Sequence, residues 1–137
     1  MTLVIDTGVL FASLDRRDAH YEACRRLIST TGEPLVIPSP VLVETDYWIR
    51  ERLYPAVRLS LLLDIASAIY RVENLVLEDY VRIRQLCERY ADADIGFVDA
   101  AVFAIVERLN EPKLATLDHR HFSLLRPRHL DSLQLLP

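Results

Sequence analysis

Two apolar segments of the chain each end in an aspartate. Leu3–Ile5 leads directly into Asp6, and the segment from Lys113 to Asp118 repeats that arrangement. Short apolar runs of this kind are typical of the buried strands of a parallel sheet. Parallel strands end at a common edge, where open α/β sheets bind ligands. We therefore expect Asp6 and Asp118 to lie at that edge. Asp6 could there serve as the N-cap of a following helix, and the alternative is a metal ligand.

Glu44 is a third candidate at the same edge. Ser39-Pro40 favours a helix start, with serine as the N-cap and proline at the first helical position. In that helix Glu44 shares a face with Val41 and Trp48, at spacings of three and four residues. A carboxylate between two apolar residues indicates a functional side chain, and exposure at the rim of the face is the alternative.

Asp99 is the fourth candidate. The segment Phe97–Leu109 is apolar almost all round and is predicted to be a buried central helix. Asp99 lies in its first turn, where the helix dipole favours a negative charge. The dipole explains the position of Asp99 but not the burial that its neighbours imply.

These four residues, here called the four-acid set, are Asp6, Glu44, Asp99 and Asp118. If they converge they repel one another, because two unit charges about 4 Å apart cost roughly 4 kcal/mol at an effective dielectric of 20. A bound cation or protonation must offset that cost. Oxygen ligands select a hard ion, Mg²⁺ or Mn²⁺ as its substitute. Such an ion coordinates substrate phosphate and activates water as a nucleophile, so the set predicts phosphodiester hydrolysis.

Strands and helices alternate along the chain, which predicts an α/β fold with a parallel sheet. Further predicted strands are Leu35–Ile37, Ile69–Val72 and an edge strand at Leu133–Leu136. Predicted helices span, in chain order, residues 9–14, 19–30 (with Asp18 as its cap), from Ser39 onward, 55–68, 75–90 and 97–109. His119–Phe122 is predicted to be a turn. On the predicted helix 75–90, Arg82, Arg84 and Arg89 are expected to form a solvated face.

Length and composition limit the classes of protein. At 137 residues with 51% hydrophobic residues the chain is expected to be one domain, 1–137, with a substantial core. We expect a cytoplasmic protein, because no apolar run approaches a membrane span and the N-terminus enters a strand without a basic leader. Cys24 and Cys87 are both expected to be core thiols. A net charge of −4 argues against broad non-specific binding of nucleic acid and still permits a local basic groove.

Four segments of the chain carry a resemblance to a known family. They are, in order, Val4–Leu10, Val43-Glu44, residues 90–100 with Tyr90, Asp92 and Asp99, and residues 115–122, Ala-Thr-Leu-Asp-His-Arg-His-Phe. In order and spacing they resemble the PIN-domain ribonucleases, and among those the VapC toxins of VapBC toxin–antitoxin modules. Each segment alone is weakly specific, and the ordered set is strongly specific.

This resemblance implies a fold, an activity and partners. The fold is a PIN-like three-layer α/β/α sandwich with a short, mainly parallel sheet of four or five strands. The activity is that of a Mg²⁺-dependent endoribonuclease that uses the four-acid set and leaves 5′-phosphate and 3′-hydroxyl ends. The partners are an RNA substrate, a second copy in a homodimer, and a VapB-type antitoxin that blocks the site. Alternatives are a housekeeping PIN nuclease in RNA maturation and an inactive PIN scaffold for protein interaction.

The resemblance also concerns residues around the site. It implies an outer-sphere role for Asp92 and for Thr116, where an ordinary β-branched strand residue is an equal alternative. Asp94 lacks such a counterpart and is interpreted as a helix-start residue. The imidazoles of His119 and His121, and with less support Arg120, are candidates for contact with RNA phosphate. A surface turn is the favoured interpretation of His119–His121.

An antitoxin segment is expected near the site as well. Leu27, Tyr47 and Trp48 lie on helices predicted to approach the four-acid set. An exposed aromatic groove is a usual receptor for an amphipathic helix. We expect the antitoxin there, with filling of the core as the alternative for these side chains.

Overall fold

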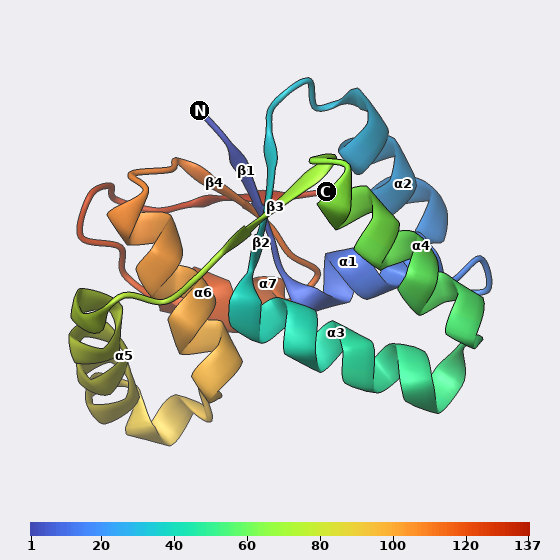
Figure 1. The fold of residues 1–137 in the computed structure, drawn as a ribbon. Coiled ribbons are helices and arrows are strands. Elements are labelled where there is room, and N and C mark those ends of the chain that lie inside the picture. The colour runs from blue at the N-terminus through green and yellow to red at the C-terminus, as the bar shows by residue number, and fades with distance from the viewer.

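The computed structural model describes residues 1–137 and contains one five-stranded sheet with every strand parallel to its neighbours (Figure 1). Its order is β3-β2-β1-β4-β5. The strands are β1 (Leu3–Ile5), β2 (Leu35–Pro38), β3 (Tyr70–Glu73), β4 (Lys113–Ala115) and β5 (Gln134–Leu136). β1 is therefore central and the C-terminal strand lies at an edge. The predicted fold class is confirmed, with five strands rather than four.

Helices cover both faces of the sheet. They are α1 (Thr7–Leu14), α2 (Tyr21–Thr30), α3 (Ser39–Arg52), α4 (Pro55–Ala66), α5 (Leu77–Arg89), α6 (Phe97–Arg108) and α7 (His119–Leu124), with a short 3₁₀ turn, η1, at Ala91–Ala93. Figure 1 shows α5 and α6 on one side of the sheet and α2 and α4 on the other. None of these helices has both the length and the hydrophobicity that crossing a membrane requires.

The strand order explains the two helical layers. From β1 the chain moves outward through β2 to β3, then crosses back over β1 to β4 and β5. Parallel crossovers are right-handed, so the two directions place their helices on opposite faces. α6 is the central helix on its face, and its residues Ala100–Val106 are all buried, as its apolar sequence predicts.

Local hydrogen bonds correct several predicted boundaries. α3 begins at Ser39, so the cap position is Pro38 and Ser39 is not the N-cap. α2 begins at Tyr21 because the Asp18 carboxylate accepts from the backbone N–H of His20 in the preceding turn. The predicted turn at 119–122 is wrong: α7 occupies it, since the Asp118 carboxylate caps that helix by accepting from the His121 N–H.

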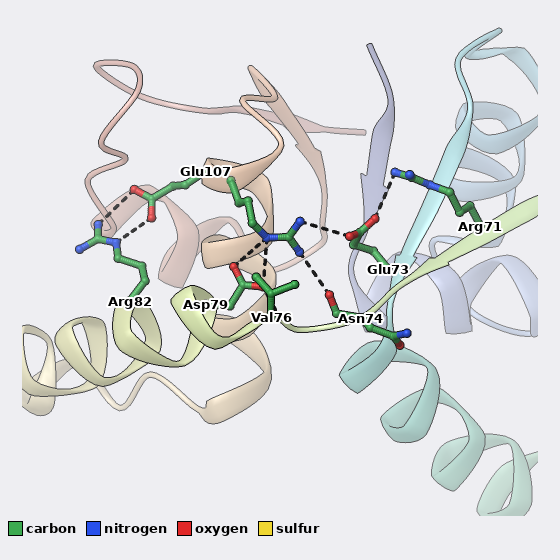
Figure 2. Close-up of polar contacts among 8 residues, drawn as sticks. Arg71, Glu73, Asn74, Val76, Asp79, Arg82 and Glu107 are labelled. Atoms are coloured by element: carbon green, nitrogen blue, oxygen red, sulfur yellow. Dashed lines mark hydrogen bonds and ion pairs between the residues drawn. The ribbon is translucent and has the colours of Figure 1, made fainter.

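The N-terminal end of α5 is tied to β3 and α6 by a charged network (Figure 2). The guanidinium of Arg108 contacts Asp79 at 3.0 Å and Glu73 at 3.2 Å, and donates to the backbone carbonyl of Asn74. The Asp79 side chain is 2% exposed and also accepts from the Val76 N–H, which fixes the start of the helix. The network holds the β3–α5 connection against α6.

Two predictions about α5 are wrong. Arg82 is not on a solvated face, because it forms a two-point ion pair with Glu107 of α6 in which both side chains are largely buried. Cys87 is exposed, whereas Cys24 is buried as predicted. The side of α5 that faces the core is narrow and consists of Asp79, Ile83 and Leu86, which leaves Cys87 outside it.

Candidate active site

The four predicted acids line one pocket at the carboxyl edge of the sheet. Its volume is about 460 Å³, and Thr7, Gly8 and Leu117 complete the lining. Asp6 directly follows β1, and Asp118 lies three residues beyond the end of β4. Glu44 comes from the second turn of α3 and Asp99 from the first turn of α6. The topology therefore brings together carboxylates from four separate segments of the chain.

Asp6 is the most buried member of the four-acid set. Its side chain lies between the central strand and α1, and the residue is only 6% exposed. Burial raises the pKa of Asp6 to about 6, and the charges of Asp99 and Glu44 act in the same direction. It occupies the N-cap position of α1 but makes no side-chain capping bond. The capping alternative therefore does not explain this carboxylate.

Thr116 connects two members of the set. Its buried hydroxyl donates to the Asp6 carboxylate at 2.9 Å and accepts from the backbone N–H of Asp118 at 3.0 Å. One side chain thus orients the Asp6 oxygens and the start of the segment that carries Asp118. An ordinary strand residue would leave both groups without these bonds.

Asp99 and Glu44 are half-buried and face the same pocket. Burial and the nearby charge of Asp118 raise the pKa of Asp99. The Gly96 backbone and His121 oppose that rise, while Glu44 adds to it. Neither Asp99 nor Glu44 forms an ion pair with a lysine or arginine.

His121 adds an imidazole that the favoured turn interpretation missed. Its Nδ1 lies 2.7 Å from an Asp118 oxygen, and this hydrogen bond raises the pKa of His121. Potential ligand atoms of Asp99, Asp118 and His121 all lie within 4.8 Å of one another. The signal in the sequence is the spacing of three residues after a capping aspartate, which places both side chains on one turn of α7. His119 instead contacts the Thr116 carbonyl through Nε2.

Other predicted residues lie outside the pocket. Asp92 is exposed on η1 and lines a neighbouring cavity together with Asp94, Arg120 and His121. The structure thus places Asp92 beside the acidic pocket but not among the residues that line it.

The expected aromatic groove is only partly open. Leu27 and Trp48 pack partly against the core, and Tyr47 is exposed, with its ring 5.0 Å from that of Trp48. Val43, one turn before Tyr47 on α3, is 72% exposed. It lines an apolar cavity of about 320 Å³ with Leu61 and Leu62 of α4. The apolar surface near the site is therefore on α3 and α4 rather than around Leu27.

The fold and the site define a class: α/β proteins with an acidic pocket at the carboxyl edge of an all-parallel sheet. Comparison with known proteins identifies the family within this class. The family model of the PIN domain matches residues 3–126. Ribonuclease VapC26 of Mycobacterium tuberculosis is 30% identical over 125 residues, which are 91% of this chain and 93% of that protein. The chain belongs to the PIN-domain family and, within it, is a homologue of the VapC ribonucleases.

Solved structures share the fold. The crystal structure of Mycobacterium tuberculosis VapC20, described as a toxin that cleaves the sarcin–ricin loop, matches with a TM-score of 0.76 and 20% identity. That match covers 82% of this chain and 87% of VapC20. VapBC2 of Rickettsia felis, bound to a DNA fragment from its promoter, matches with a TM-score of 0.74 and 16% identity over the whole of both chains.

Proposed function

We propose that this protein, as a single domain spanning 1–137, is a divalent-metal-dependent endoribonuclease and the toxin of a toxin–antitoxin module. The convergence of the four-acid set on one pocket carries the proposal. Homology to Ribonuclease VapC26 supports RNA as the substrate. Mg²⁺ is the proposed ion, with Mn²⁺ as its substitute.

The residues present fit a divalent cation. Four carboxylates line the pocket, and His121 is the only basic side chain paired with any of them. Raised pKa values at Asp6 and Asp99 reflect burial and unbalanced negative charge, which a cation would relieve. The Thr7 hydroxyl, also on the pocket lining, is buried without a hydrogen-bond partner. The imidazole beside the carboxylates favours Mn²⁺ more than an all-oxygen set would.

We assign metal binding to Asp6, Glu44, Asp99 and Asp118. A bound divalent cation supplies Lewis acidity toward the phosphoryl oxygens and activation of a water nucleophile. The chain's own groups provide orientation: Thr116 fixes the Asp6 carboxylate, and the His121 ring and backbone N–H fix both oxygens of Asp118. Fixed ligands avoid reorganisation during the reaction, which is the main catalytic contribution of such sites.

The outer-sphere assignment of Asp92 stays a prediction. Asp92 shares its cavity with His121, which contacts Asp118, and this places Asp92 beside the four acids rather than among them. Loss of an outer-sphere partner typically costs 10–100-fold in metal affinity or activity. Asp94 is left out of the site.

A VapB-type antitoxin and a second copy of this chain are the proposed protein partners. The solved relatives include VapBC complexes from Rickettsia felis and Salmonella typhimurium. Exposed apolar side chains on α3 and α4, among them Val43, Tyr47, Leu59 and Leu62, support a protein-covered surface there. An antitoxin arginine or lysine that reaches the four acids would stand in for the cation.

Expression in a host without the antitoxin tests the toxin assignment. Wild-type protein should arrest growth, Asp118→Asn should not, and co-expression of the antitoxin should restore growth. Harmless expression of soluble wild type that cleaves RNA after purification would favour the RNA-maturation alternative. Folded wild type that cleaves no RNA would favour the inactive scaffold.

A further inference from the structure

A second cavity adjoins the acidic pocket through one shared contact. Its volume is about 600 Å³, and it lies between the C-terminal end of α5, η1 and α7. His121 lines this cavity and also bonds to Asp118, which lines the pocket. The two cavities therefore meet at the His121–Asp118 pair, and an extended chain bound in the acidic pocket can continue past this pair into the second cavity. The volume is within the usual range for ligand sites, about 300–1,000 Å³.

Two arginines on this cavity have no acidic partner. Arg89 and Arg120 form none of the ion pairs of the structure, whereas Arg84, on the same helix as Arg89, is paired with Glu88. The Arg89 guanidinium lies 5.4 Å from the centre of the Tyr90 ring. This cation–π contact orients the group without neutralising its charge. Both guanidinium groups are therefore available for phosphate, which they can bind through two hydrogen bonds.

Asp92 and Asp94 line the same cavity, so its lining carries negative as well as positive charge and is unfavourable for a free anion. A free phosphate would meet their repulsion as well as the attraction of the arginines. A nucleotide matches the mixture better, because its phosphate is anionic and its base carries N–H donors that a carboxylate can accept. Single-stranded RNA presents both groups to a protein at once.

We propose that this cavity binds the nucleotide next to the cleaved phosphate of a single-stranded RNA, with Arg89 and Arg120 on its backbone. The inference rests on the proposed function. It adds a binding site for the part of the RNA that extends beyond the four acids. Arg89 and Arg120 are binding residues in this scheme and take no part in bond cleavage.

Salt-dependent binding tests the proposal in an Asp99→Asn background, which prevents cleavage during the measurement. The probe is a fluorescein-labelled single-stranded RNA of mixed sequence, followed by anisotropy across a salt series. Each phosphate contact contributes about 0.7 to the slope of log K against log salt for single strands. Arg89→Gln and Arg120→Gln should each lower the slope by about that amount and weaken binding, with unchanged melting temperatures.

Arg84→Gln is the matched control, because Arg84 is an exposed arginine of α5 outside the cavity. It should keep the slope of its parent. Slopes for Arg89→Gln and Arg120→Gln that equal the Arg84→Gln slope would overturn the cavity assignment, even if wild type cleaves RNA. Wild type that fails to cleave RNA would instead overturn the proposed function, and the slopes would still decide whether this cavity holds RNA.

Discussion

Asp6→Asn should change how the stability of the metal-free protein depends on pH. Burial raises the pKa of Asp6 from 3.8 to about 6 in the folded state. The folded protein then holds this proton more tightly than the unfolded chain does. The contribution of Asp6 to the free energy of unfolding should therefore be fully present below about pH 4 and be lost as pH rises through about 6.

The size of the effect follows from the shift. A change of about two pKa units corresponds to about 3 kcal/mol of lost stability, at 1.36 kcal/mol for each unit. For a chain of this length the unfolding entropy is about 0.3 kcal/mol/K, so the loss is about 10 °C in melting temperature. Asparagine does not titrate, so this pH-dependent loss should be absent in Asp6→Asn. Any cost of burying the amide is the same at every pH and cancels in the comparison.

The assay is chemical or thermal unfolding in EDTA at pH 4 and pH 7.5. Between these values Asp6→Asn should gain about 3 kcal/mol relative to wild type. Asp131→Asn, an exposed acid without a side-chain hydrogen bond, is the control and should follow wild type within about 0.5 kcal/mol. If the stability of Asp6→Asn changes between the two pH values by the same amount as that of wild type, then folding does not raise the pKa of Asp6.

Three further predictions concern a hydrogen bond at the site, the charged network of Arg108, and metal binding. Thr116→Val should destabilise the fold by about 1–3 kcal/mol and lower RNA cleavage, because the half-buried Asp118 N–H and the buried Asp6 carboxylate both lose their hydrogen-bond partner; unchanged stability and rate would contradict its bridging role. Arg108→Met should cost about 3–5 kcal/mol in urea unfolding, because Asp79 is left as a buried unpaired charge; a cost below about 1 kcal/mol would show that the network adds little. Mg²⁺ or Mn²⁺ at a hundredfold excess over its Kd should stabilise the wild type by about 2.7 kcal/mol in a thermal scan, and no response to millimolar ion would contradict a metal site.

Much of the fold follows from local sequence patterns. β1 and β4 were predictable because apolar runs that end in aspartate are typical of strands that reach a ligand-binding edge. The all-apolar α6 was predictable for the same kind of reason, since a helix without a polar face must be buried. Because parallel strands share an edge, the convergence of Asp6 and Asp118 followed from the strands alone.

The features that sequence reasoning missed depend on tertiary contacts or on short elements. Arg82 is buried against Glu107, a residue 25 positions away, and no local pattern on α5 indicates that pairing. His121 lies beside Asp118 because residues 119–124 form the helix α7. With six residues this helix is too short for its periodicity to be visible in the sequence, so it was predicted as a turn. Cys87 is exposed because the buried side of α5 is narrower than its apolar residues suggest. Each error arises where packing, rather than propensity, decides the environment.

RNA cleavage by purified Asp99→Asn, measured beside wild type and Asp131→Asn, tests whether the four acids form the active site. Wild type and Asp131→Asn should cleave single-stranded RNA in Mg²⁺ or Mn²⁺ and lose that activity in EDTA. Asp99→Asn should remain folded, as circular dichroism will show, and lose more than the 10–100-fold typical of an outer-sphere change. Wild-type rates from folded Asp99→Asn, or equal cleavage by wild type in EDTA, would show that the four acids are not a metal-dependent active site.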